Sequence, residues 1–115
     1  MSLLKIRPTV LFFIVVLGIS ILGQSTGSVR GTITDQGKGR IVNAKILAEK
    51  RGFRRTVMSD ADGRYEIQLP DGIYEIRVKQ DGFIPSKAER IQIKGNKILE
   101  LDFVLIGVRN DTEHP

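Results

Sequence analysis

The sequence predicts an all-β fold, a seven-stranded antiparallel β-sandwich of Greek-key type preceded by an N-terminal apolar signal segment. Three observations support this prediction. Seven short runs after residue 27 alternate apolar with polar residues, which gives each strand one face toward a core and one toward water. Turn-forming Gly, Asp, Asn or Pro residues bound the runs. No convincing apolar repeat of helical spacing occurs after residue 27, and the best candidate for a helical turn is 86–90.

The first 23 residues are typical of a secretory signal peptide. Lys5 and Arg7 precede an apolar run from Val10 to Leu22, and small or polar residues follow it. The run has 13 residues, whereas a helix needs about 20 to cross a bilayer. An uncleaved membrane anchor is the alternative. We therefore expect an exported protein, periplasmic or extracellular, whose contact with a membrane, if any, is through this segment.

The composition of the remaining chain argues against a nucleic-acid-binding protein and against a domain stabilised by disulfides. Of the 18 Lys and Arg residues, all but Lys5 and Arg7 remain, so 16 cations face 13 Asp and Glu, a charge of +3. That excess is too small to indicate a nucleic-acid partner. With no cysteine in the sequence, no disulfide can stabilise a domain of about ninety residues, and its sheets must be regular to be stable.

The first four predicted strands are 28–34, 43–50, 55–59 and 64–69. Alternation predicts these inward residues in three of them: Val29, Gly31, Ile33, Ala44, Ile46, Ala48, Tyr65, Ile67 and Leu69. In the second strand the outward set is Lys45, Leu47 and Glu49. The inward set of the third strand is ambiguous.

The segment from Asp60 to Gly63, between strands three and four, is similar to the opening of a calcium-binding loop. A complete calcium site needs six to eight oxygen ligands, and further acids at suitable spacing are missing downstream. Asp accepts backbone hydrogen bonds in tight turns, and Gly supplies a positive φ there. We therefore expect a tight turn rather than a metal site.

The last three predicted strands are 73–79, 89–94 and 97–106, and residues 107–115 are expected to form a disordered tail. The inward residues of the first and last of these strands are Tyr74, Ile76, Val78, Leu99, Leu101, Phe103 and Leu105. We expect strands 89–94 and 97–106 to pair as a hairpin, with Ile93 opposite Leu99 and Ile91 opposite Leu101. Tyr65, Tyr74, Phe83 and Phe103 alternate with the strand period, which indicates core and turn anchors rather than a sugar-stacking platform.

The candidate binding loop is a cluster of cations around one aromatic residue: Lys50, Arg51, Phe53, Arg54 and Arg55. At a loop tip these groups could bind an anionic glycan, phosphate groups or an acidic protein patch. The alternative is a solvated hairpin whose charges protect a sheet edge from aggregation.

Catalysis is not expected, because the chain lacks the residues for the common mechanisms. His114, the single histidine, stands one residue from the end of the sequence, and cysteine is absent. Neither a zinc site nor a nucleophile–histidine pair can be built inside the domain from these residues. We predict no catalytic residue, no metal and no cofactor.

Several segments in order resemble the carboxypeptidase regulatory-like domains, which have a transthyretin-like β-sandwich fold. These segments are VRGTITD (29–35), NAKI (43–46), SDADGRYEI (59–67), LPDGIY (69–74), GF (82–83) and LDFVL (101–105). The resemblance spans residues 28–106. It departs from the family at Arg40 and Ile41, where a proline is common.

The resemblance implies a folding, docking or binding module without catalysis. Together with the basic loop, it leads us to expect a binding module at the cell envelope whose partner is an unknown protein or an anionic glycan. A structural subunit that assembles through edge strands is the alternative. Related hydroxyisourate hydrolases need His and Arg residues and a C-terminal Tyr-Arg-Gly-Ser motif. This chain ends with Asn110 to Pro115 instead, so the enzyme is the least favoured of the three hypotheses.

Overall fold

The computed structural model describes residues 25–108, and every regular element in that range is a β-strand. The strands are β1 (Thr26–Asp35), β2 (Lys45–Lys50), β3 (Phe53–Met58), β4 (Arg64–Pro70), β5 (Gly72–Lys79), β6 (Phe83–Ile84), β7 (Glu89–Ile93), β8 (Ile98–Glu100) and β9 (Phe103–Gly107). The predicted signal segment 1–23 and residues 109–115 of the predicted tail lie outside the described residues. Within residues 25–108 no helix is long and apolar enough to span a membrane.

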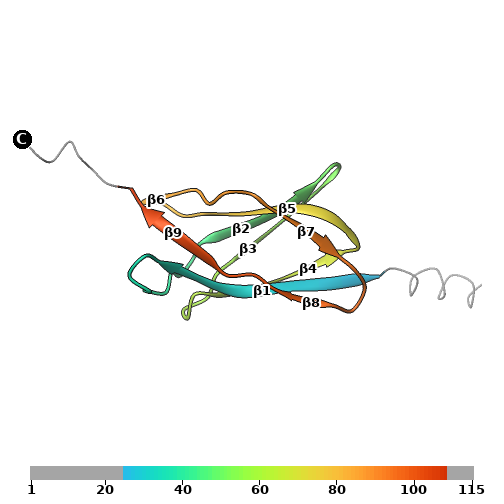
Figure 1. Cartoon of the computed structure of the whole chain (residues 1–115), viewed down its shortest axis with the longest axis horizontal. Coiled ribbons are helices and arrows are strands. Elements are labelled where there is room, and N and C mark those ends of the chain that lie inside the picture. The colour runs from blue at the N-terminus through green and yellow to red at the C-terminus, as the bar shows by residue number, and fades with distance from the viewer. Residues whose placement is uncertain (1–24, 109–115) are drawn as a thin grey trace, which may run out of the picture.

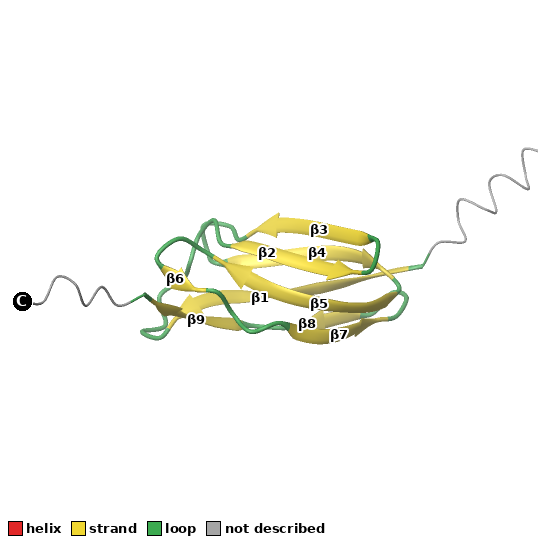
Figure 2. Cartoon of the chain, turned by 90° about the horizontal axis from the view of Figure 1, so that it is seen from above, coloured by secondary structure: helices red, strands yellow, loops and turns green. Residues whose placement is uncertain are grey.

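The strands form two sheets that pack face to face, so the predicted all-β sandwich is confirmed (Figures 1 and 2). One sheet has the order β4-β1-β9-β6, with β8 also paired to β1, and the other has the order β3-β2-β5-β7. Seven predicted runs become nine strands, because the last run divides and a short β6 is added. Pairing is antiparallel throughout except that β1 pairs in parallel with β8 and β9.

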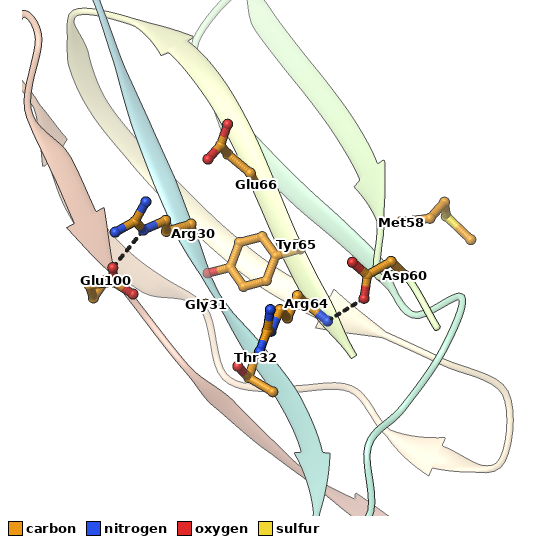
Figure 3. Close-up of a pocket in the computed structure, with 9 residues that line it drawn as sticks. All are labelled: Arg30, Gly31, Thr32, Met58, Asp60, Arg64, Tyr65, Glu66 and Glu100. Carbon is orange, nitrogen blue, oxygen red and sulfur yellow. Dashed lines mark hydrogen bonds and ion pairs between the residues drawn. The ribbon is translucent and has the colours of Figure 1, made fainter. Parts of the chain in front are cut away.

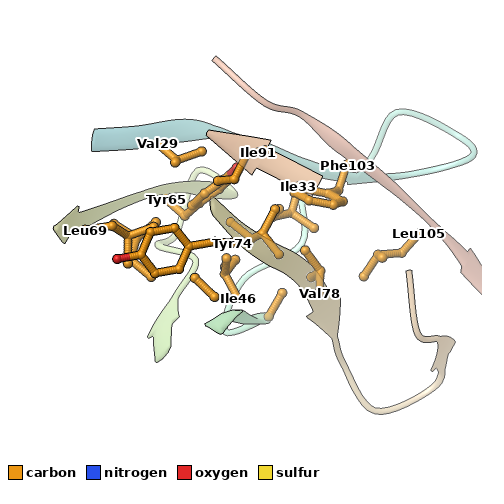
Figure 4. Packing of buried hydrophobic residues seen from close by; sticks show 14 of the residues in the cluster. Val29, Ile33, Ile46, Tyr65, Leu69, Tyr74, Val78, Ile91, Phe103 and Leu105 are labelled. Atoms are coloured by element: carbon orange, nitrogen blue, oxygen red, sulfur yellow. The ribbon is translucent and has the colours of Figure 1, made fainter. Parts of the chain in front are cut away.

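The core between the sheets is made mainly by the alternate residues that the sequence predicts (Figure 4), although Leu99, which is also predicted inward, is 36% exposed on the short strand β8. Its largest fully buried side chains are Tyr74, Ile33, Ile46, Ile67, Leu69, Ile76, Leu105, Val29 and Val78. Tyr65 and Phe103 are also buried, and Phe83 packs against the cluster while half-buried. The aromatic residues are therefore core and anchor residues, as predicted.

One residue on an outward face departs from the expected pattern. Leu47 lies on the outer face of β2, yet only 8% of it is exposed. Its cross-strand partners there are Thr56 and Arg77. A long cationic side chain covers apolar surface with its aliphatic stem while its charge stays in water, which explains how an outward leucine becomes buried.

The predicted hairpin between the last two runs is wrong. β7 pairs with β5 in one sheet, whereas β8 and β9 pair with β1 in the other. The partners of Ile93 and Ile91 are therefore Gly72 and Tyr74, and Leu99 pairs with Val29. Alternation fixes which face of a strand is buried, but a strand that crosses to the other sheet keeps the same alternation, so the pattern could not reveal the crossing.

The last run breaks between β8 and β9, where the chain crosses over Gly31. Leu101 N donates to Arg30 O at 2.8 Å, and the Asp102 carboxylate accepts from Thr32 N at 2.8 Å in place of a backbone carbonyl. A Cβ on Gly31 would lie 1.9 Å from Leu101 O. The close approach of the two backbones requires glycine at this position.

Residues 86–90, the candidate helical turn, form no helix. Ser86 instead pairs with β5: its N–H donates to Val78 O at 3.0 Å, and its hydroxyl oxygen accepts from Val78 N at 2.8 Å. From Glu89 the chain continues as β7. The serine side chain thus replaces one backbone group of the ladder and holds the connection between β6 and β7 against the sandwich.

Candidate functional site: the basic end

The predicted binding loop lies at the β2–β3 hairpin, which turns through Arg51 and Gly52. Gly52 has a φ of 78°, a left-handed conformation that glycine adopts without steric cost. Arg51 is exposed at this tip. Its side chain forms no hydrogen bond or ion pair with another residue in the range 25–108.

Phe53 is part of the packing rather than a free aromatic at the loop tip. It is half-buried, and its ring meets that of Tyr74 edge-on, with centroids 5.8 Å apart and planes at 74°. Lys50 Nζ lies 4.9 Å from the centroid of the Tyr74 ring and donates to Asp71 O at 3.2 Å. Both residues therefore stabilise the hairpin against β5 through aromatic and cation–π contacts.

The other two arginines of the predicted loop point away from the tip on opposite faces of β3. Arg54 Nη2 pairs with Glu49 Oε2 at 3.2 Å on the outer face. Arg55 Nη1 donates to Gln68 O of β4 at 2.5 Å, and its guanidinium lies 5.1 Å from the centroid of the Phe53 ring. Arg55 thus links the edges of the two sheets. The structure does not gather the five predicted residues into one set that faces a ligand.

Two lysines that the sequence prediction omitted lie at the same end of the sandwich as Arg51. The β4–β5 and β7–β8 connections both reach the start of β1: Asp71 N donates to Ser25 O at 3.1 Å, and Asn96 N donates to Thr26 O at 2.8 Å. Lys94 and Lys97 flank the second connection and are exposed. Only the topology brings them near the hairpin, because the local pattern around them indicates no more than a turn.

We call this end, formed by Ser25 and the loops 50–53, 70–72 and 94–97, the basic end; it lies on the right in Figure 1. This end contains one carboxylate, Asp71, and four cations, which gives a net charge of +3. The cations are Lys50, Arg51, Lys94 and Lys97. The loops 35–43, 59–63 and 80–82 form the opposite, acidic end. There Asp35, Asp60, Asp62 and Asp81 outnumber Lys38 and Arg40, which gives a net charge of −2.

A shallow groove of about 550 Å³ on the outer face of β1 and β4 is the other candidate site (Figure 3). Arg30 Nε pairs with Glu100 Oε1 at 2.6 Å across it, and this hydrogen bond and charge raise the pKa of Arg30. The Tyr65 hydroxyl donates to Leu101 O at 2.6 Å. Burial, followed by the charges of Asp102 and Glu100, raises the pKa of Tyr65. These bonds hold β8 and its connection to β9 on β1, which is a structural role.

The turn at Asp60 is confirmed as a backbone-capping turn. Its carboxylate oxygen accepts from Asp62 N and from Arg64 N, each at 2.9 Å, and Gly63 has a φ of 72°. In the part of the chain that the structure describes, no three His, Cys, Asp or Glu residues lie close enough together to hold a metal ion.

Comparison with solved structures relates the fold to domains of several larger proteins. The TIE protein of Bacillus anthracis matches with a TM-score of 0.64 and 23% identity, over 73% of this chain and 17% of that chain. The Streptococcus agalactiae minor pilin GBS52 matches with a TM-score of 0.60 and 14% identity, over 76% of this chain and 47% of that chain. Chlorocatechol 1,2-dioxygenase from Pseudomonas putida matches at 0.60 and 13%, over 72% and 61%. At these identities the likeness is one of fold.

The chain thus spans between 17% and 61% of the length of these structures. No curated protein matches the sequence. The family model of the carboxypeptidase regulatory-like domain, in contrast, matches residues 28–106, which include both sheets up to the last residues of β9. The chain therefore belongs to the carboxypeptidase regulatory-like domain family.

Proposed function

We propose that the protein is an exported, non-catalytic accessory module that binds a partner at the cell envelope, a protein or an anionic glycan, through its basic end. The observation that carries the proposal is the set of exposed cations Arg51, Lys94 and Lys97 on a rigid sandwich. Their side chains form no bond within residues 25–108, so they are available to carboxylate, sulfate or phosphate groups. Loops on rigid scaffolds are common binding surfaces.

Two observations support a module without catalysis. The chain belongs to a family of regulatory-like domains, and the titratable groups Arg30, Glu100 and Tyr65 of the β1–β4 groove already bond to one another or to the backbone.

The N-terminal sequence, with its basic start and apolar run, supports export. The fold likeness to a minor pilin agrees with it.

A pull-down from the native envelope fraction tests the proposal. The immobilised chain is compared with the variant Arg51→Glu plus Lys94→Glu, and with the control Lys38→Glu plus Arg64→Glu, which makes the same change of charge in and next to the loops of the acidic end. We expect the first variant to lose the captured partner and the control to keep it. If all three proteins capture the same partners equally, the basic end is not the binding surface.

A second candidate function, self-assembly through an edge strand, is favoured by one observation on β9. The pairing of β6 with β9 includes Ile84 opposite Ile106, and in that register Ser86 would stand opposite Val104. Ser86 bonds to Val78 instead. Val104 is 60% exposed, and within the described residues no strand pairs with it on the β6 side of β9. Such an edge can accept a strand from a second copy.

Light scattering during size-exclusion chromatography distinguishes the second candidate from the first. Assembly predicts an apparent mass that rises with protein concentration and that falls to the monomer mass in Val104→Lys, because a charge on an edge strand opposes pairing. A monomer at every concentration would remove assembly and leave the binding module.

A further inference from the structure

The start of the described chain lies in the middle of the basic end. Ser25 O accepts from Asp71 N, and Thr26 O accepts from Asn96 N, so the first residues of β1 are held between two of the loops that carry the cations. Ser28 N also donates to Lys97 O at 3.0 Å. In the sequence, the apolar run of Val10 to Leu22 ends three residues before Ser25.

That spacing limits the distance between the apolar run and the basic end. Three residues reach at most about 10 Å when fully extended. The Debye length at physiological ionic strength is about 8 Å. While the apolar run occupies a membrane during export, the basic end therefore stands within about one Debye length of the lipid headgroups. At about one Debye length a surface potential has fallen to roughly a third of its value, so the charges of the basic end still interact with the membrane surface.

The side chains of three of the four cations at this end form no hydrogen bond or ion pair within the described residues, although Glu49 and Glu75 line the same hollow as Arg51. Arg51, Lys94 and Lys97 are exposed, and within residues 25–108 their side chains have no ion-pair partner. Two exposed apolar side chains flank them: Ile73 is 49% exposed on the outer face of β5, beside Arg51 in one hollow, and Ile98 is 55% exposed at the start of β8. Cations bordered by apolar side chains suit the boundary between headgroups and acyl chains.

The charge of the molecule is also polarised along the strands. The basic end carries a net charge of +3 and the acidic end a net charge of −2. A negatively charged surface attracts the first and repels the second, so it orients the sandwich with Ser25 toward itself and β9 away from it. The ends of β6 and β9 then point outward and remain open to other partners (Figure 1).

We propose that the basic end docks on a membrane surface of anionic phospholipid, with Arg51, Lys94 and Lys97 on the headgroup phosphates. The inference rests on the proposed function, since it assumes the same export and the same basic end, but it names anionic lipid instead of a protein or glycan as the partner of that end. A lipid surface is favoured over a soluble glycan because the chain itself brings this end to the membrane. Each cation at such a surface is expected to strengthen binding about fivefold.

Vesicle sedimentation tests the proposal. Residues 25–108 contain both sheets and the whole core, so a chain that starts at Gln24 keeps the sandwich and lacks the apolar run. We expect this chain to sediment with vesicles of equal parts phosphatidylglycerol and phosphatidylcholine and to stay in solution with phosphatidylcholine alone. Binding should weaken steeply as NaCl rises from about 50 mM to about 300 mM.

Two matched variants locate the surface. Arg51→Glu, Lys94→Glu and Lys97→Glu together should weaken partitioning at least about 100-fold. The control Lys38→Glu, Arg64→Glu and Lys79→Glu substitutes the same residue types in the acidic-end loops or directly beside them, far from the basic end, and should change partitioning by no more than about threefold. Equal binding to neutral vesicles, or an equal loss in the control, overturns the proposal. Circular dichroism of each variant checks that the sheets remain.

A soluble polyanion separates this inference from the proposed function. If heparin binds the chain while anionic vesicles do not, the lipid is not the ligand, although the basic end still binds an anionic partner. If neither binds and the envelope pull-down also fails, both proposals fail. Vesicle binding that survives an equal charge of heparin in solution supports the membrane surface as the preferred partner.

Discussion

The two ends of the sandwich are made of the same kind of short loops, but they use polar side chains in opposite ways. At the acidic end these side chains hold the backbone. Asp35 accepts from Gly37 N and Gly39 N, each at 2.8 Å, and Asp60 caps the turn that follows it. Arg40 donates to Asp62 O at 2.8 Å. Because these groups satisfy backbone atoms, their identity is set by the fold.

At the basic end the connections are held mainly by backbone hydrogen bonds to Ser25, Thr26 and Ser28. Lys50 stabilises the hairpin, but the side chains of Arg51, Lys94 and Lys97 form no hydrogen bond or ion pair with other residues in the range 25–108. The fold therefore does not require their charge. The acidic end thus uses its polar side chains for structure, whereas the fold makes no use of the charges of Arg51, Lys94 and Lys97.

Gly31 lies where β1 changes its partner from β8 to β9, and replacing it should have the largest effect on stability. β1 pairs with β8 up to Arg30 and with β9 from Ile33, and the chain between β8 and β9 crosses over Gly31. Gly31→Ala puts a methyl group 1.9 Å from Leu101 O, and the backbones must separate. We expect the free energy of unfolding to fall by about 3 kcal/mol or more, measured by urea denaturation.

Gly37→Ala is the matched control at the acidic end. A Cβ there would meet its nearest neighbour, Asp35 Oδ1, at 3.4 Å, which is an ordinary contact. We expect a change within about 0.5 kcal/mol. A similar loss in both variants would mean that the crossing at Gly31 is not the tight junction that the geometry describes.

Ser59→Ala tests the claim that the acidic end depends on its polar side chains. Ser59 is 2% exposed, its hydroxyl donates to Ile41 O at 2.7 Å, and it accepts from Ala44 N at 2.9 Å. The substitution leaves a buried carbonyl and a buried N–H without this partner. We expect a loss of about 2 kcal/mol by urea denaturation. Ser28→Ala is the control and should cost much less, since its hydroxyl forms no hydrogen bond within the described residues.

Much of the fold could be predicted from the sequence because its information is local. A side chain reverses its face at every strand residue, so the alternation in 64–69 is enough to bury Tyr65, Ile67 and Leu69. The turn at Asp60 is predictable for the same reason, because its hydrogen bonds span two to four residues.

The sheet assignment of β7 and β8, in contrast, depends on partners that are distant in the sequence. Val29 and Leu99 are paired, although 70 positions separate them. The arrangement of the candidate binding loop depends on such partners as well, because a local pattern cannot reveal that Phe53 packs against Tyr74. The local pattern also omits Lys94 and Lys97, because the pairings of β7 with β5 and of β8 with β1 are what bring them to the hairpin end.

Tyr65 offers a smaller effect with a defined pH dependence. Tyr65→Phe removes the hydrogen bond to Leu101 O and should lower the free energy of unfolding by about 1 kcal/mol at neutral pH. The pKa of Tyr65 is raised above its ordinary value of 10 in the folded state, mainly by burial. Above pH 10 the unfolded chain therefore releases this proton while the folded chain keeps it, so the stability of the wild type falls as pH rises.

The phenylalanine variant lacks this loss, so its stability should approach that of the wild type as the pH rises above 10. Taking the difference between the two proteins cancels the titration of lysines that both share. Urea denaturation at a series of pH values provides the measurement. A difference that stays constant, or widens, above pH 10 would contradict the burial of the Tyr65 hydroxyl.

The smallest effect on stability is expected at the basic end. Arg51→Ala, Lys94→Ala and Lys97→Ala together should change the free energy of unfolding by less than about 0.5 kcal/mol, because none of these side chains bonds within residues 25–108. Asp35→Ala alone should lower the free energy of unfolding by about 1 kcal/mol, since Gly37 N and Gly39 N lose their hydrogen-bond acceptor. If the three cations proved as costly to remove as Asp35, they would serve the fold, and the basic end would lose its distinction as a binding surface.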